Sequence, residues 1–305
     1  MKSSLNWRDF EIIATGGGEK LERWGGVYLL RPDPQAIWSP AFDFKKFDGL
    51  NAHYIRSTTG GGKWVTLKKF PTEWTVEYPI SGCALKFLIS PTNFKHTGLF
   101  PEQAINWEQF TSIIQSSRVA HGAKTGAGVA ENNLAPNVLN LFGYTGGATV
   151  AAGVAGANVT HVDASTGMTA VCRRNCELNG LENVRFIVDD CHKFVEREIR
   201  RGKTYDAIIA DPPSFGRGAN GEVWKIETAL EPLIMDCVKL LSKKPLFFLV
   251  NSYTTGLQPT VLKNVLQRCL EKFGRRAKLD AYEIGIPTRE GIDLPAGASC
   301  FAVFE

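Results

Sequence analysis

The sequence lacks any apolar run long enough to cross a bilayer, and its first residues lack the apolar stretch of a secretory signal peptide. It also contains no CxxC pair, no internal repeat and no low-complexity segment. These absences argue against a membrane span, an exported chain and a repeat architecture. We therefore expect a soluble protein that works in the cytoplasm.

The pattern of a metal site or a disulfide framework is missing as well. The seven cysteines are scattered and odd in number. Cys172 and Cys176 are four residues apart, as on one face of a helix, but His192 follows Cys176 by 16 residues and no His lies within ten residues of the pair. Structural zinc takes four Cys or His ligands, so no bound metal is expected. Free thiols in a reducing compartment are the better interpretation.

Charge of one sign is present only in small excess, with a net charge of +4 and a pI near 8.6. The excess lies in residues 1–95, which hold 13 Lys and Arg against 9 Asp and Glu. A mildly basic surface suits a polyanionic partner but does not establish one.

Residues 1–95 contain short β-favouring pieces separated by Gly and Pro, and they predict a small antiparallel β domain. The tip at residues 58–63, which is rich in Gly, is expected to be mobile. The predicted strands cover residues 27–31, 64–67, 74–78 and 85–89.

Residues 96–305 form the second predicted domain, in which strand-like and helix-like runs alternate. Such alternation is typical of an α/β fold, a Rossmann-like parallel sheet with helices on both faces. Residues 278–284 and 299–304 would add an antiparallel pair. The predicted strands are 138–141, 159–162, 184–188, 207–210 and 246–250. The predicted helices are 148–155, 167–179, 192–201, 226–241 and 259–273.

The turn after the first of these strands is rich in glycine, at Gly143, Gly146 and Gly147. Glycine lets a backbone approach a ligand closely, and ligands of open parallel sheets bind beyond the carboxyl ends of the strands. The spacing is not GxGxxG, which argues against a dinucleotide. The candidate cofactor-binding residues here are Asn140, Phe142, Gly143, Tyr144, Thr145 and Gly146.

Acidic residues follow the next two strands. Asp163, beside Ala164, is suited to accept hydrogen bonds from ribose hydroxyls; the alternative is that residues 163–165 cap the next helix. Asp190 is suited to accept from an adenine amino group, while Asp189 would cap the following helix. Cys191 would offer its backbone N–H to the adenine ring.

The fourth strand ends in Asp211-Pro212-Pro213-Ser214-Phe215. Two prolines remove N–H donors and stiffen the loop. Backbone carbonyls and the Asp211 carboxylate could then hold a target amine or ring, with Phe215 stacking on a base. Asp211 is also a candidate cofactor-binding residue. The alternative is an ordinary turn at a strand end.

From about residue 94 onward, the sequence resembles the class I S-adenosylmethionine-dependent methyltransferases that modify bases of 23S ribosomal RNA. The subfamily it resembles contains a cytosine-C5 enzyme and a guanine-N7 domain. The resemblance is carried by residues 100–103, 139–147, 175–180, 189–190 and 211–215. It implies a seven-stranded sheet, S-adenosylmethionine bound across the first four strand ends, catalysis at Asp211, Pro212, Pro213 and Phe215, and ribosomal RNA as substrate.

One departure from this subfamily concerns the base. The cytosine-C5 relatives carry a nucleophilic cysteine after the fifth strand, where residues 250–256 here contain none. Cys191 is a poor candidate for this nucleophile because it lies where the adenine ring is predicted to bind. N-methylation is therefore somewhat favoured.

Support for RNA from the residues themselves is modest. Basic side chains are interleaved with aromatic ones in the first domain, a pattern that suits single strands. An equally good interpretation is a solvated hairpin whose aromatic side chains face a core. The interleaved residues are Phe42, Phe44, Lys45, Lys46, Phe47, Tyr54, Arg56, Lys63, Trp64, Lys68 and Lys69.

The sequence leaves three other functions open. They are a methyltransferase acting on a protein or small molecule, a noncatalytic RNA-binding protein and, last, an NAD-dependent oxidoreductase. The sequence also leaves the oligomeric state open.

Overall fold

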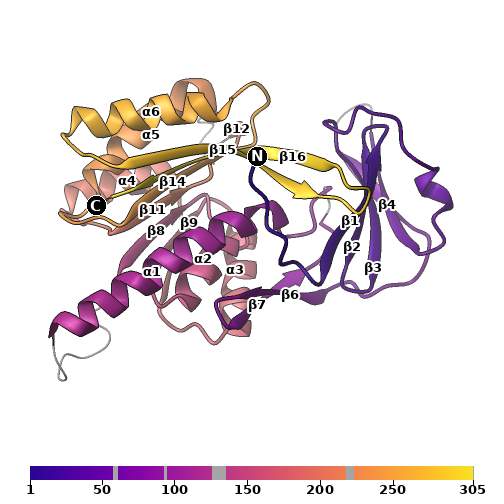
Figure 1. Cartoon of the computed structure of the whole chain (residues 1–305), viewed down its shortest axis with the longest axis horizontal. Helices are drawn as coiled ribbons and strands as arrows, with labels where there is room; N and C mark the ends of the chain where they lie inside the picture. Colours follow the sequence, from indigo (N-terminus) through magenta and orange to yellow (C-terminus); the bar gives the residue numbers. More distant parts are fainter. Residues whose placement is uncertain (58–60, 93–94, 126–134, 218–222, 305) are drawn as a thin grey trace. The chain divides into compact units, whose positions relative to one another are not determined.

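In the computed structural model, seven strands from the second part of the chain form one mixed sheet (Figure 1). The structure describes residues 1–57, 61–92, 95–125, 135–217 and 223–304. Across the sheet the order is β10-β9-β8-β11-β14-β16-β15. The strands are β8 (Asn137–Leu141), β9 (Asn158–Asp163), β10 (Val184–Val188), β11 (Ala207–Ala210), β14 (Phe247–Ser252), β15 (Lys278–Pro287) and β16 (Asp293–Val303).

The strand directions confirm the predicted α/β fold. Strands β8, β9, β10, β11 and β14 run in parallel, and β16 lies antiparallel against β14. The chain builds outward from β8 to β10 and then returns to the other side of β8 with β11. The strand order therefore reverses between β8 and β11, and this is the place where such sheets bind ligands.

Helices cover both faces of the sheet. Helices α4, α5 and α6 pack on the face that carries Leu139, Ile208 and Phe248. Helix α1 packs on the opposite face, where Phe110 stacks on Phe247 at 5.8 Å between ring centroids. The sequence predicted α2 to α6 to within two residues at each end but missed α1. The helices are α1 (Ala104–Thr125), α2 (Gly147–Val154), α3 (Thr166–Leu178), α4 (Cys191–Arg200), α5 (Ile226–Lys239) and α6 (Pro259–Lys272).

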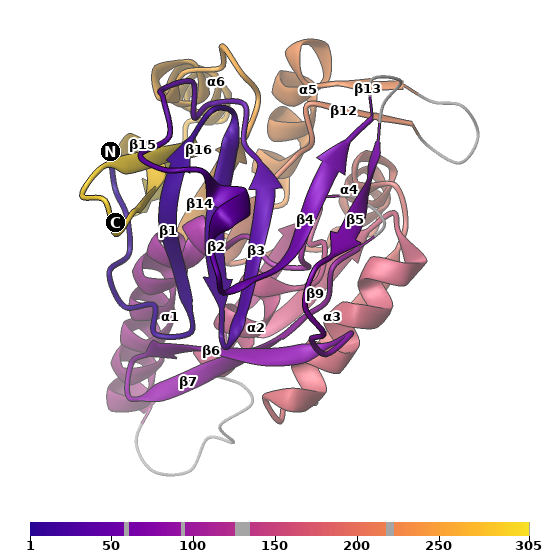
Figure 2. The ribbon, with the colours of Figure 1, turned by 90° about the vertical axis from the view of Figure 1, so that its right-hand side faces the viewer.

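The first part of the chain forms the predicted small β domain, with five strands side by side (Figure 2). One pairing departs from the antiparallel expectation, because β3 and β4 run in parallel. Residues 58–60 of the predicted mobile tip lie outside the described residues. The elements are β1 (Phe10–Gly16), β2 (Glu19–Trp24), β3 (Val27–Pro32), η1 (Phe44–Lys46), β4 (Leu50–Arg56), β5 (Gly62–Thr66), a hairpin of β6 (Trp74–Ile80) and β7 (Cys83–Ile89), and η2 (Pro101–Gln103).

The chain divides into two compact units. One contains Asn106–Ile284 and the C-terminal strand from Gly297, and the other contains Lys2–Ile105 together with Gly285–Ala296. The division between residues 95 and 96 stays a prediction. Within the described residues, no helix is both long and apolar enough to span a membrane.

Candidate active site

Four neighbouring strands of the large sheet end at the same edge. The register places Leu141 of β8 beside Ala210 of β11 and Val162 of β9, and Asp163 beside Val188 of β10. The residues that follow these strand ends are therefore brought together. They are the β8–α2 turn (residues 142–146), Asp163, Asp190 and the loop of residues 211–215, called here the proline loop.

The β8–α2 turn has an unusual backbone. Phe142 and Tyr144 have φ values of 56° and 50°, in the left-handed region that side chains other than glycine rarely adopt. Gly146, with φ 89°, is the N-cap of α2, and its N–H donates to the Gly143 carbonyl at 2.9 Å. Such strain persists only where the surroundings impose it, and it is concentrated at functional sites.

Asp163 holds this turn from the end of β9. Its Oδ2 accepts a hydrogen bond from the backbone N–H of Tyr144 at 2.8 Å, and its Oδ1 accepts from the N–H of Ser165 at 2.8 Å. The N-cap of α3 is Ser165, whose Oγ accepts from the N–H of Met168. Within the segment of residues 163–165 that could cap this helix, the cap is therefore Ser165 and not Asp163. Each carboxylate oxygen keeps a further lone pair, which suits it to accept from a diol.

The two acids after β10 have different surroundings. The N-cap of α4 is Asp190, whose Oδ1 accepts from the N–H of Lys193 at 2.9 Å. The prediction that Asp189 caps this helix is therefore wrong. The Asp189 carboxylate forms an ion pair with Arg197 of α4 instead. An acid already paired with a guanidinium is a weaker acceptor for a ligand, which leaves Asp190 as the candidate.

The Cys191 side chain points into the protein. Its Sγ accepts from the N–H of Phe142 at 3.3 Å and lies 3.7 Å from the carbonyl of Val162. Burial raises the pKa of the thiol well above its ordinary value. The thiol therefore ties α4 to β8 and β9 and is not poised to act as a thiolate nucleophile.

The proline loop is anchored from two directions. The Ser214 hydroxyl is 2.7 Å from Oγ1 of Thr254, which follows β14, and the Ser214 carbonyl accepts from the N–H of Ile226 at 3.1 Å. Pro212 is buried, whereas the Phe215 side chain is 53% exposed. The exposed ring is available to a ligand, as a stacking role would require.

A short hairpin follows this loop and was not predicted from the sequence. It consists of β12 (Phe215–Arg217) and β13 (Val223–Lys225). Trp224 donates from Nε1 to the Pro213 carbonyl at 2.6 Å, and its ring lies 5.4 Å from the ring of Phe142. The signal available in the sequence was a lone tryptophan eleven residues after the second proline.

These features fit a nucleoside-like cofactor by their donor and acceptor chemistry. Ribose hydroxyls and an adenine amino group are donors, and the acids at the ends of β9 and β10 are acceptors. A family model described as S-adenosylmethionine-dependent methyltransferase matches residues 107–236. A crystal structure of an S-adenosylmethionine-dependent methyltransferase from Agrobacterium tumefaciens superposes with a TM-score of 0.85 at 31% identity, covering 99% of this chain and 92% of that one.

The chain belongs to the S-adenosylmethionine-dependent methyltransferases.

Sequence relatives of this methyltransferase include ribosomal RNA large subunit methyltransferases. It is 37% identical over 148 residues to ribosomal RNA large subunit methyltransferase I of Aeromonas salmonicida, covering 48% of this chain and 32% of that protein. It is 29% identical over 150 residues to ribosomal RNA large subunit methyltransferase K of Neisseria meningitidis, covering 48% and 42%. The chain thus spans less than half the length of either protein.

A buried network of polar side chains packs against the β8–α2 turn of the methyltransferase on the side of the protein interior. Asn140 donates from Nδ2 to Thr149 Oγ1 at 2.9 Å, and Thr149 Oγ1 is 2.9 Å from Nδ1 of His161. The carbonyl of Thr145 accepts from Asn175 at 2.8 Å. Asn140 and Thr145 are each 2% exposed, so both lie within the packed base of the turn, and their contact with a cofactor stays a prediction.

The polar residues after the fifth parallel strand also face inward. Asn251 accepts from Asn106 of α1 at 3.2 Å and from Ser299 of β16 at 2.8 Å. Asn251 and Ser252 are 2% and 1% exposed. They stabilise the strand end and do not line a surface.

The interleaved basic residues of the first β domain are exposed, whereas most of the aromatic residues among them are buried or half-buried. Phe44 and Tyr54 are buried, and Phe47 packs on Tyr28. The cations point to solvent, and of these aromatics Phe42 is 42% exposed. The described surface therefore offers charge for phosphates and little stacking area. The exposed cations are Lys45, Lys46, Arg56, Lys63, Lys68 and Lys69.

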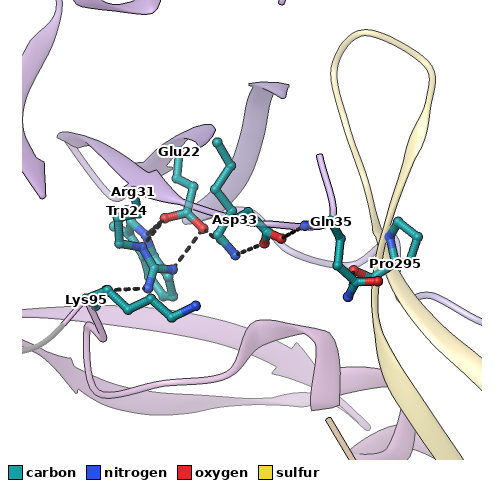
Figure 3. Close-up of polar contacts among 8 residues, drawn as sticks. Glu22, Trp24, Arg31, Asp33, Gln35, Lys95 and Pro295 are labelled. Atoms are coloured by element: carbon teal, nitrogen blue, oxygen red, sulfur yellow. Dashed lines mark hydrogen bonds and ion pairs between the residues drawn. The ribbon is translucent and has the colours of Figure 1, made fainter. Parts of the chain in front are cut away.

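A buried ion pair lies inside the same β domain (Figure 3). Glu22 accepts from Arg31 at 2.6 and 2.9 Å, and Arg31 also donates to the carbonyl of Lys95 at 2.8 Å. Burial opposes the charge on Glu22, but attraction by Arg31 and Lys20 holds the pKa of Glu22 below its ordinary value. In the part of the chain that the structure describes, no group of three His, Cys, Asp or Glu could hold a metal ion.

Proposed function

We propose that this methyltransferase transfers a methyl group from S-adenosylmethionine to a base of large-subunit ribosomal RNA. The observation that carries the proposal is the meeting of Asp163, Asp190 and the proline loop at one sheet edge. The ribosomal RNA substrate is supported by relatives that share about half of this chain. We place the proposed reaction in the cytoplasm, where the ribosomal RNA of the bacterial relatives is found.

In this proposal the cofactor lies across the ends of the first parallel strands. Asp163 would accept from the ribose hydroxyls, Asp190 from the adenine amino group, and the backbone of residues 142–146 would line the amino-acid end. Ala164 and the backbone N–H of Cys191 border the nucleoside. The cofactor supplies an electrophilic methyl group, so the protein's own contribution is proximity and orientation of the acceptor.

The proline loop would hold the acceptor base. Pro212 and Pro213 have no N–H, so the loop presents carbonyl acceptors to an amine of the base. The Asp211 carboxylate would accept a hydrogen bond from the same amine, and the exposed ring of Phe215 would stack on the base. Such a loop orients a nucleophilic nitrogen without adding to the ring.

Four of the six cysteines of the large unit support N-methylation over cytosine C5. Addition to a cytosine ring requires a thiolate. Burial raises the pKa of Cys269 to about 11 and that of Cys300 to about 12, and it raises the pKa of Cys237 and Cys191 as well. These thiols are protonated and enclosed at neutral pH.

The test is transfer of tritiated methyl from S-adenosylmethionine to total RNA from a strain that lacks this protein. We expect label that RNase removes and protease leaves, and nucleoside analysis showing an N-methylated base. Label in 5-methylcytidine would contradict the choice of atom. Label in protein, or none in RNA while calorimetry shows cofactor binding, would move the acceptor to another class.

A further inference from the structure

We propose that Trp224 is a positioning residue that couples the β8–α2 turn to the proline loop. Its indole contacts one residue of each segment: Nε1 donates to the Pro213 carbonyl at 2.6 Å, and the ring lies 5.4 Å from the Phe142 ring at an angle of 54°. The inference rests on the proposed function, because it assigns a task in the same methyl transfer.

The hairpin geometry directs Trp224 inward. It pairs with Gly216 in the β12–β13 register, and successive side chains of a strand point to opposite faces. Its neighbours Val223 and Lys225 are exposed, whereas Trp224 is half-buried and packs against the core beneath the sheet edge. The tryptophan is therefore held by the fold and does not swing freely in solvent.

The proline loop depends on such a contact because it has few donors of its own. With two prolines in succession, the loop is anchored through its carbonyls and side chains. The structure shows anchors from Trp224 to Pro213, from the N–H of Ile226 to the Ser214 carbonyl, and from Thr254 to the Ser214 hydroxyl. Of these three anchoring contacts, the one from Trp224 comes from a side chain that also packs against Phe142 of the β8–α2 turn.

The contact to Phe142 reaches the strained part of the turn. Phe142 has φ 56°, and its N–H is held by Cys191 at 3.3 Å. A residue in this conformation keeps it only while its neighbours impose it. The Trp224 side chain therefore links the strained turn to the Pro213 carbonyl, and through this link it sets where the acceptor loop lies relative to the turn.

Two variants separate the two contacts. Trp224→Phe keeps an aromatic ring against Phe142 but removes the N–H donor, and Trp224→Ala removes both. Calorimetry with S-adenosylhomocysteine measures cofactor-site affinity, and steady-state kinetics on an unmodified large-subunit ribosomal RNA transcript measures turnover. We expect Trp224→Phe to leave Kd unchanged and to lower kcat about 3- to 10-fold, the scale of one hydrogen bond. Trp224→Ala should in addition weaken binding about 3- to 10-fold, the scale of an aromatic contact.

The matched control is Trp74→Phe in the other compact unit, where Nε1 donates to the Trp24 carbonyl at 3.0 Å. It removes the same atom from a similar bond and should change neither Kd nor kcat. Equal loss of affinity in both Trp224 variants, or unchanged kcat in both, would overturn the proposal. If wild-type protein binds S-adenosylhomocysteine but methylates no RNA, the proposed substrate is wrong. In that case calorimetry still tests whether Trp224 couples the two segments. If Trp224→Ala binds S-adenosylhomocysteine with the same Kd as the wild type, the coupling is disproved.

Discussion

Gly143 lies so close to His161 that a Cβ atom at position 143 would overlap the imidazole ring. Gly146 stands in the same relation to Cys172 of α3. The glycines of the β8–α2 turn are therefore required by side chains packed beneath the turn, whatever binds above it. A Gly-rich run of this kind indicates tight packing as much as it indicates a ligand.

Gly143→Ala should lower the free energy of unfolding by about 1–3 kcal/mol, because overpacking forces the His161 ring or the turn to move. The displaced turn should also bind S-adenosylmethionine more weakly. The control is Gly167→Ala in α3, where the nearest atom to an added Cβ is 3.9 Å away. Chemical denaturation should show no loss there and a gain of up to about 1 kcal/mol. Equal losses at both positions would contradict the packing argument.

His161 should make stability depend on pH. Burial lowers the pKa of His161 to about 4, whereas an unfolded His titrates near about 6.5. As the pH falls, His161 is protonated first in the unfolded chain. The stability that the neutral, buried His161 contributes is therefore fully present above the unfolded pKa, and it is lost as the pH falls toward the folded pKa. The decline from this group should approach about 3 kcal/mol.

Burial also lowers the pKa of His96 to about 4, so the comparison is made in a His96→Gln background that removes this titration. The measurement is urea unfolding from pH 7 to pH 4 of His96→Gln and of His96→Gln with His161→Gln. The His161 variant should show the shallower decline. Parallel pH profiles would show that His161 is not buried in its neutral form.

Asp163→Ala should weaken S-adenosylmethionine binding by roughly 1–3 kcal/mol, the scale of leaving polar partners unpaired. Two backbone amides as well as the ribose would lose their acceptor. Asp206→Ala is the matched control, because its carboxylate accepts from the N–H of Asn137 at 2.9 Å at the opposite end of β8. Calorimetry should show unchanged affinity for the control. Unchanged affinity in Asp163→Ala would remove the ribose assignment.

Asp211→Asn should reduce kcat about 10- to 100-fold, the scale of one hydrogen bond to a charged group. Cofactor affinity should stay near that of wild type, because we propose that this carboxylate serves the acceptor base. Kinetics and calorimetry on the same preparation check both statements. A collapse of affinity that equals the loss of turnover would make Asp211 a cofactor ligand instead.

Glu22→Gln should destabilise the β domain by about 3–5 kcal/mol, since it leaves the Arg31 charge buried without its partner. The Glu22 side chain is fully buried and that of Arg31 is 8% exposed. Replacing both residues, as Glu22→Leu with Arg31→Met, should cost less than the single change. Thermal or chemical unfolding of the wild type and these two variants decides this. A double variant that loses as much stability as Glu22→Gln, or more, would contradict the argument that an unpaired buried charge is the main cost.

Local signals in the chain were enough to predict most of the large unit. The alternation of runs from residue 138 determined the parallel sheet, and the Asn179-Gly180 pair ended α3, with Asn179 as C-cap and Gly180 at φ 65°. The acids after β9 and β10 and the two prolines after β11 could be placed at one edge, because parallel strands share the direction of their carboxyl ends. Each of these inferences depends on neighbours within a few residues.

Tertiary contacts decided what those signals left open. Which acid caps α4 depended on Arg197, which draws Asp189 away and leaves the cap to Asp190. The role proposed for Trp224 could not be predicted from the sequence, because it depends on β13 placing this side chain between Phe142 and Pro213. The parallel pairing of β3 with β4 and the grouping of Gly285–Ala296 with the first β domain likewise join segments far apart in the chain. Periodicity and turn chemistry act over a few residues, whereas such contacts form only once the chain has folded.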